Sequence, residues 1–169
     1  MRKCAVAFLL FLCGCASYSW KTSVPELFST VDVPVFRNET SLTGFGANLS
    51  MQVSREFQRE GSFKLSTEAA IEIQGVAKKT SVASRDLFAA RTRRHREHIV
   101  NAEVEVSVVN KKTGEVLIES RRYLARTTVL ADRDIVTAER SAAGRLAEQI
   151  ARQVVDDMVH FKWKKGDVK

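Results

Sequence analysis

The chain has 169 residues, of which 44% are hydrophobic and 28% are charged, and its formal net charge at pH 7 is +7. These proportions are those of a globular protein, so they exclude a disordered or low-complexity chain, and the length suits one ordinary domain. The basic balance is compatible with a surface that meets phosphates or anionic lipid, although it does not require one.

The first fifteen residues have the pattern of an export signal. Arg2 and Lys3 precede an apolar run at residues 5–12, and the segment ends in Leu12-Cys13-Gly14-Cys15. The run is too short to cross a bilayer, which takes about 20 residues, so it fits a signal peptide at 1–14. Its ending resembles a lipobox, which predicts cleavage before Cys15 and lipidation of that cysteine. An ordinary secretory signal followed by an incidental cysteine is the alternative.

Cleavage there would decide which cysteines and charges remain. Cys4 and Cys13 would leave with the signal peptide, and the remaining cysteine would carry the lipid, so we expect no disulfide, zinc site or thiol catalysis. The mature chain would have 155 residues, with 25 basic and 20 acidic side chains and a net charge of +5. Ala16 stands where an aspartate would favour inner-membrane retention. We therefore expect a chain anchored by lipid at the outer membrane, on its periplasmic side.

The segment after the cysteine leads into the fold. Residues 15–28 have no clear period, so we interpret them as the lipid anchor and a tether. Apolar side chains then alternate from Val31 to Val35, which predicts a strand over 31–36. Pro34 lacks a backbone donor, which favours an edge or a bulge over a central ladder.

The period then changes to that of a helix. After a turn at residues 37–40, apolar residues recur at steps of three and four: Leu42, Phe45, Leu49, Val53 and Phe57. Ser41 or Thr43 can cap the start of this helix, and Gly61 suits the position after its last turn. The pattern predicts an amphipathic helix that buries one face.

Strand patterns fill the middle of the chain. A short strand is predicted at 63–66, and a longer one begins at Ile71 and runs past Lys79. A polar, basic stretch covers residues 80–98.

The next strand pair is the clearest. Valine and alanine alternate with polar residues over 100–108, and a hairpin turn at 111–114 returns the chain into a strand over 116–129. The apolar parity of the returning strand changes near Arg121, which favours a bulge.

The last element is a long helix. An apolar stripe runs from Ile135 to Phe161, with Asp132 or Asp134 available as its N-cap, and a polar tail follows at 162–169. Each helix has one apolar stripe and the strands have one apolar face. We therefore predict an α+β domain over 29–161, an open, mainly antiparallel sheet of four or so strands with two helices packed on one face.

Several segments are similar to one known family. Residues 33–40 read Val-Pro-Val-Phe-Arg-Asn-Glu-Thr, and further similarity lies at 56–65, at 69–75, at the turn 113–117 and in the last helix. Together they resemble the lipopolysaccharide-assembly lipoprotein (LptE) family over nearly the whole mature chain.

The resemblance implies a non-enzymatic role without cofactors. Members of this family sit inside the outer-membrane β-barrel LptD, assist its folding and plug its lumen, and the pair delivers lipopolysaccharide to the outer leaflet. The lipoprotein itself binds lipopolysaccharide. The alternative is a structural lipoprotein of another envelope or secretion-channel assembly that has the same strand and helix opening.

Basic residues are concentrated in one stretch of the chain. Seven of them, opposed only by Asp86 and Glu97, are Lys78, Lys79, Arg85, Arg91, Arg93, Arg94 and Arg96. Arginine grips phosphate with a planar fork and lysine acts as a point charge, and lipid A carries phosphates. We expect these residues to contact lipopolysaccharide or the acidic lumen of the barrel; a solvated loop without a partner is the alternative.

Other chemistry is not indicated by the sequence. No Gly-rich phosphate loop or nucleophile elbow occurs, and the three histidines are too scattered for a metal site. His95 and His98 are expected to be exposed members of the basic stretch. Because an exported, lipidated chain does not meet nucleic acid, we expect no nucleic-acid partner.

Overall fold

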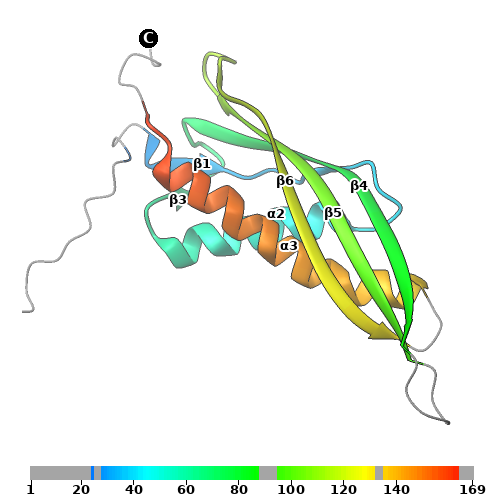
Figure 1. Ribbon diagram of the computed structural model, residues 1–169. Coiled ribbons are helices and arrows are strands. Elements are labelled where there is room, and N and C mark those ends of the chain that lie inside the picture. Colours follow the sequence, from blue (N-terminus) through cyan, green and yellow to red (C-terminus); the bar gives the residue numbers. More distant parts are fainter. Residues whose placement is uncertain (1–23, 25–27, 88–94, 132–134, 164–169) are drawn as a thin grey trace, which may run out of the picture.

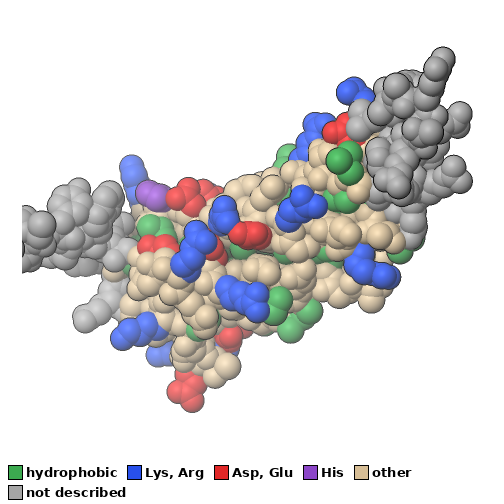
Figure 2. Space-filling view, turned by 90° about the horizontal axis from the view of Figure 1, so that it is seen from below, with side chains coloured by type: hydrophobic (Ala, Val, Ile, Leu, Met, Phe, Trp, Pro, Cys, Tyr) green, Lys and Arg blue, Asp and Glu red, His purple; other side chains and the backbone are tan. Residues whose placement is uncertain are grey.

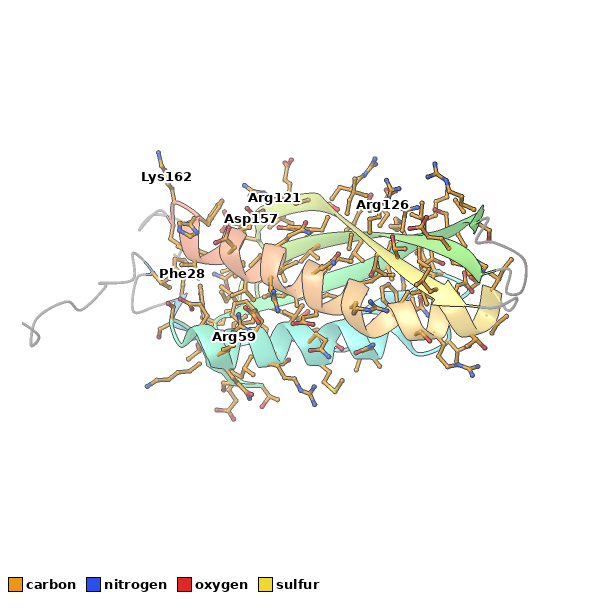
Figure 3. All side chains as sticks on the ribbon, turned by 60° about the horizontal axis from the view of Figure 1, so that its bottom comes forward. Phe28, Arg59, Arg121, Arg126, Asp157 and Lys162 are labelled. Atoms are coloured by element: carbon orange, nitrogen blue, oxygen red, sulfur yellow. The ribbon has the colours of Figure 1, made fainter. Side chains whose placement is uncertain are left out.

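The computed structural model describes residue 24 and residues 28–87, 95–131 and 135–163. Its helices and strands in chain order are β1 (Thr30–Asp32), β2 (Arg37–Asn38), α2 (Phe45–Glu60), β3 (Lys64–Leu65), β4 (Ile71–Leu87), β5 (His95–Asn110), β6 (Val116–Ala131) and α3 (Ile135–His160) (Figure 1). Both helices lie on one face of the sheet, with α2 beside α3 (Figures 1 and 3). The predicted α+β class, with two helices on one face of an open sheet, is confirmed. Neither described helix is long and apolar enough to cross a membrane.

Three long strands make up most of the sheet. β4, β5 and β6 pair in antiparallel order and have 17, 16 and 16 residues. The short strands β1 and β2 pair with β4 in parallel, and β3 pairs with β1, so the order is β3-β1-β4-β5-β6 with β2 beside β4. The sheet is therefore mainly antiparallel. It has more strands than the sequence predicted, because three very short ones join at its edge.

The predicted strand at 31–36 is interrupted at Pro34. Asp32 pairs with Glu72 of β4, and the next pairing is Arg37 with Val76. The segment from β1 to β2 therefore has four residues between these two pairings, whereas β4 has three. An extra residue in one strand reverses which side chains face inward. The prediction that Val35 shares the inner face with Val31 is consequently wrong: Val35 is 75% exposed, whereas Phe36 is 3% exposed.

Two glycines make room for Phe36. A Cβ atom on Gly75 of β4 would lie 2.2 Å from Cδ2 of the Phe36 ring, and one on Gly46 of α2 would lie 2.2 Å from the Phe36 carbonyl oxygen. Both distances are far inside van der Waals contact. Phe36 therefore fixes the approach of α2 to the sheet.

The residues after Phe36 lead into α2. The side-chain oxygen of Asn38 accepts hydrogen bonds from the backbone N–H of Thr40 (3.1 Å) and from its hydroxyl (2.8 Å), and its amide donates to the carbonyl of Leu42 (2.7 Å). Residues 37–38 form strand β2, so the predicted turn at 37–40 is wrong for these two residues, and the chain turns after Asn38. The helix follows Gly44, at φ 75°, without a side-chain cap, so capping by Ser41 or Thr43 was a wrong prediction. The predicted end is confirmed by Gly61, at φ 83°.

The core lies between the helices and the inner face of the sheet. The predicted α2 stripe is confirmed, with Leu49, Val53 and Phe57 fully buried. Ile118 and Tyr123 of β6 are both buried although they are five positions apart, a step that would put them on opposite faces of a regular strand. The pairing of β6 with β5 shifts between these two residues. The predicted bulge near Arg121 is confirmed.

Aromatic side chains close the end of the domain where α3 ends. Trp163 stacks on Phe28 with ring centroids 5.0 Å apart, and it also contacts Phe63 and Phe161. The indole N–H of Trp163 donates to the carbonyl of Met158 at 3.2 Å. The first described residue of the main body is thereby packed against the last, and we call this the Phe28 end of the domain.

Candidate functional site

The structure separates the predicted basic cluster into parts. Lys78, Lys79 and Arg85 lie on β4, and Arg96 belongs to β5. Arg91, Arg93, Arg94 and the predicted lipidation site Cys15 lie outside the described residues. At about 3.3 Å per residue, the seven positions from Lys78 to Arg85 correspond to more than 20 Å along the strand. Lys78 and Lys79 are therefore remote from the end of the hairpin, where Arg85 and Arg96 lie in adjacent strands.

Lys78 is held within the fold. It is the extra residue at a bulge in β4, and its Nζ lies 3.1 Å from Oε2 of Glu39 and 3.8 Å from Oε2 of Glu105. The hydrogen bond from Lys78 is the main cause that keeps the pKa of Glu39 below its ordinary value, and Arg37, 2.6 Å away, adds to it. A ligand phosphate would have to compete with these carboxylates for Lys78.

The other two basic residues of β4 stand on the face of the sheet opposite the helices. The register places Lys79 beside Glu103 and Arg85 beside Glu97, because the central strand β5 carries its acidic residues on this face. On the other side of β5, Arg122 pairs with Glu103 at 3.0 Å, and Arg126 lies beside Asn101 (Figure 3). The outer face is thus a mixed surface in which basic residues of β4 and β6 flank acidic residues of β5.

Apolar side chains are exposed where β6 ends and α3 begins. Leu130, which is 65% exposed, lies beside Glu97 on the outer face, in the same row of the sheet as Arg85. Ile135 and Val136 are exposed at the start of α3. These exposed apolar residues were not among those predicted to form a site. Their signal was present, however, because two successive apolar residues in an alternating strand require one of them to face outward.

His98 does not belong to the exposed basic stretch, contrary to the prediction. It lies on the inner face of β5 with 0% exposure, and its Nδ1 is 2.9 Å from the hydroxyl of Ser84. Because strands β4 and β5 continue well into residues 80–98, which were predicted only as a polar, basic stretch, alternation turns this side chain inward. Among the described residues, no group of three or more His, Cys, Asp or Glu side chains is placed to hold a metal ion.

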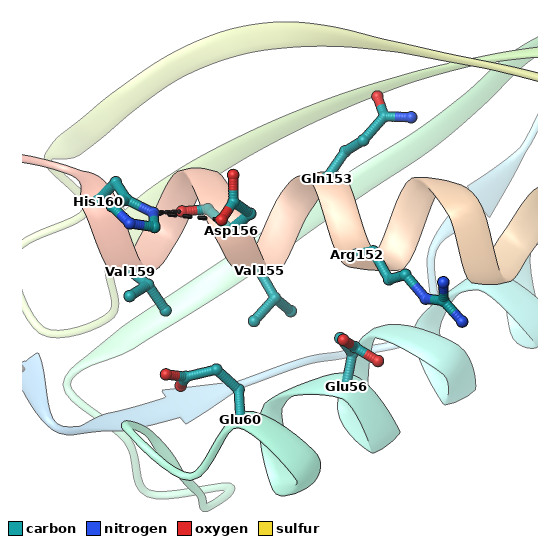
Figure 4. A pocket seen from close by; sticks show the side chains of 8 residues that line it. All are labelled: Glu56, Glu60, Arg152, Gln153, Val155, Asp156, Val159 and His160. Atoms are coloured by element: carbon teal, nitrogen blue, oxygen red, sulfur yellow. Dashed lines mark hydrogen bonds and ion pairs between the residues drawn. The ribbon is translucent and has the colours of Figure 1, made fainter. Parts of the chain in front are cut away.

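A second feature is a groove between the C-terminal halves of the two helices (Figure 4). Its volume is about 560 Å³, and its lining residues are Glu56 and Glu60 of α2 and Arg152, Gln153, Val155, Asp156, Val159 and His160 of α3. We call it the α2/α3 groove. This groove was not predicted, since it arises only when the ends of two helices from distant parts of the chain lie side by side.

Charged side chains elsewhere are dispersed. Seen from the side shown in Figure 2, Lys and Arg side chains are spread along the domain with Asp and Glu between them. No single large basic patch is visible among the described residues on that side.

Comparison with known proteins gives one family match. The model of the LptE family, described as lipopolysaccharide-assembly, matches residues 28–158. This range contains every described strand and nearly all of α3. No curated protein matches the sequence.

Solved structures show the same fold at low sequence identity. The hypothetical protein CT253 from Chlamydia trachomatis is 11% identical, with 78% of this chain and 95% of that chain covered and a TM-score of 0.55. A putative neuraminyllactose-binding hemagglutinin homolog from Helicobacter pylori is 11% identical, with 84% and 89% covered and a TM-score of 0.52. At such identities the similarity shows the fold alone.

Proposed function

Because this chain belongs to the lipopolysaccharide-assembly (LptE) family, we propose that it plugs the outer-membrane β-barrel LptD, assists the assembly of that barrel and binds lipopolysaccharide during its delivery to the outer leaflet. The observation that carries the proposal is the family match over residues 28–158, which spans the whole described sheet, α2 and nearly all of α3. The role is a non-enzymatic one of binding and assembly.

The proposed anchor is Cys15, which would be lipidated after removal of residues 1–14. Residues 15–28 would then connect the membrane to the Phe28 end of the domain, and residues 29–161 would form the functional domain. Several acyl chains on one cysteine bind a bilayer firmly, since each buried CH₂ contributes about 0.8 kcal/mol.

The proposed lipopolysaccharide contact is the end of the β4–β5 hairpin. Lipid A combines phosphates with acyl chains, so its receptor needs basic and apolar side chains close together. Arg85 and the exposed Leu130 share one row of the sheet there, and the exposed Ile135 begins the neighbouring helix. Arg91, Arg93, Arg94 and Arg96 follow in sequence, whereas Lys78 and Lys79 are proposed as secondary contacts with ligand or barrel.

Copurification tests the proposed partner. We expect the full-length chain, extracted from membranes in mild detergent, to bring down a large outer-membrane β-barrel in a stable complex. Recovery of an oligomeric secretion channel without such a barrel would instead favour a structural lipoprotein of another envelope assembly.

Charge reversal tests the basic stretch. Replacing Arg91, Arg93, Arg94 and Arg96 together by Glu is expected to weaken binding of lipopolysaccharide at least tenfold, which corresponds to about 1.4 kcal/mol, because four phosphate-binding charges become repulsive. A matched variant changes four exposed basic residues elsewhere: Arg55, Lys64, Lys112 and Lys162. Equal binding by both variants, with unchanged circular dichroism, would assign the stretch to solvated surface.

A further inference from the structure

The α2/α3 groove has the opposite charge to the rest of the protein. Three carboxylates, Glu56, Glu60 and Asp156, line it together with a single guanidinium, that of Arg152. With His160 neutral, the lining carries a formal charge of −2, whereas the whole chain carries +7. An anionic ligand such as lipopolysaccharide would be repelled here, and a cationic group would be attracted.

Internal contacts leave part of this negative charge uncompensated. Glu56 pairs with Arg59 at 3.1 Å, and Arg152 is turned to Glu148 on its own helix. The carboxylate of Glu60 instead accepts hydrogen bonds from the backbone N–H of Ser62 at 2.8 Å and from the Ser62 hydroxyl at 2.5 Å, and neither donor carries a charge.

The carboxylate of Asp156 is the second uncompensated charge. Its ion-pair partner in the described part of the chain is His160, at 3.3 Å, which is charged only when protonated. Asp156 and Glu60 therefore stand on opposite walls of the groove, and neither carboxylate is paired with Lys or Arg in the part of the chain that the structure describes.

The floor of the groove is apolar. Val155 and Val159 lie between the charged walls, with Val155 packed into the core (Figure 4). A bare metal ion does not suit this arrangement, since no described group of three or more ligating side chains converges there. A chain segment in which Lys or Arg stands beside apolar side chains satisfies both features, because its apolar groups cover the floor while its charges meet the walls.

The groove lies at the Phe28 end of the domain. His160 ends α3, and Trp163, three residues later, stacks on Phe28, where the chain comes from its N-terminal segment (Figure 3). The remaining part of the inference rests on the proposed function. With Cys15 anchored in the membrane, this end would face the periplasmic rim of the barrel, and the opposite end would carry the proposed lipopolysaccharide contact.

We propose that the α2/α3 groove docks a cationic, partly apolar segment of the β-barrel partner, presented at its periplasmic rim. The two charged surfaces of the domain then have separate tasks. The basic hairpin end meets the anionic lipid, and the acidic groove fixes the protein to its barrel.

Charge reversal of Glu60 and Asp156 tests this assignment. The Glu60→Lys, Asp156→Lys double variant of the full-length, membrane-extracted chain is expected to retain at least tenfold less barrel than the unchanged chain, while its binding of lipopolysaccharide is unchanged. The matched control is Glu68→Lys with Glu119→Lys, which makes the same change of charge at exposed positions outside the groove. The control is expected to retain the barrel.

The outcomes separate the two proposals. Retention of the barrel by the groove variant at the level of the control would overturn the docking assignment and leave the proposed function intact. Absence of a barrel with the unchanged chain would remove the proposed function and the docking assignment with it. If the double Lys variant has a lowered melting temperature, Glu60→Gln with Asp156→Asn replaces it, and undiminished retention by that variant also counts against the assignment.

Discussion

Replacing Phe36 by alanine is expected to lower the free energy of unfolding by about 3–5 kcal/mol, the range found for large aromatic side chains removed from a core. Phe36 is 3% exposed, and its ring lies against Gly75 while its carbonyl lies against Gly46. Loss of the ring leaves a cavity at the point where α2 meets the sheet. Denaturant unfolding followed by circular dichroism measures the change.

The contact with Gly75 gives this prediction a specific second test. Gly75→Ala alone is expected to cost about 1–3 kcal/mol, because its Cβ would lie 2.2 Å from the Phe36 ring and the ring is enclosed. In the Phe36→Ala background the same substitution is expected to cost less than about 1 kcal/mol, since the clashing ring is gone. Simple additivity of the two changes would show that the ring does not occupy the space above Gly75.

Gly46 provides a contrast with Gly75. Its added Cβ would meet the backbone carbonyl of Phe36, not the ring, so Gly46→Ala is expected to remain costly in the Phe36→Ala background. Gly144→Ala serves as the control for introducing a methyl group into a helix. Its Cβ would have no neighbour within 4 Å, so this change is expected to stabilise the chain by up to about 1 kcal/mol.

The two halves of α3 are expected to differ at least 100-fold in amide hydrogen exchange. Before Gly144 the helix buries only Ala138 and Ala142, whereas after it the buried side chains include Leu146, Ile150 and Met158. The N-terminal part of α3 also extends beyond α2 (Figure 3). Because a large buried side chain contributes about 1.5–3 kcal/mol, the first half can open at a much lower free energy than the second.

Exchange measured by mass spectrometry on peptides from each half tests this expectation. Amides at 139–144 should exchange at least 100-fold faster than those at 150–155, and Gly144→Ala should slow the first group by about fivefold, in line with about 1 kcal/mol of helix propensity. Uniform protection along α3 would contradict the expectation and indicate that the whole helix opens as one unit.

Much of the fold was predictable because its elements have clear periods. The three- and four-residue steps from Phe45 to Phe57 determined which face of α2 is buried, and Gly61 determined where that helix ends. The bulge near Arg121 was visible as a change of parity in the sequence itself. These features are local, so the neighbouring residues alone specify them.

Where the structure differs from the prediction, contacts between distant segments are one cause. Alternation alone placed Val35 inside, but the extra residue beside Pro34 turns Phe36 inward, where Gly75 leaves space for it. The basic residues that are close together in sequence are also separated in space. Strand β4 is extended, so Lys78 and Arg85 lie at different heights of the sheet, and Glu39 takes Lys78 as its partner.

The long hairpins have a consequence for where a bound lipid would be held. Sixteen strand residues extend about 50 Å, whereas a bilayer with its head groups is about 40–45 Å thick. The Phe28 end and the end of the β4–β5 hairpin lie at opposite ends of this length (Figure 1). With Cys15 anchored in the inner leaflet and the domain inside the barrel, as proposed, a sheet of this length would place the end of the β4–β5 hairpin at the height of the outer leaflet.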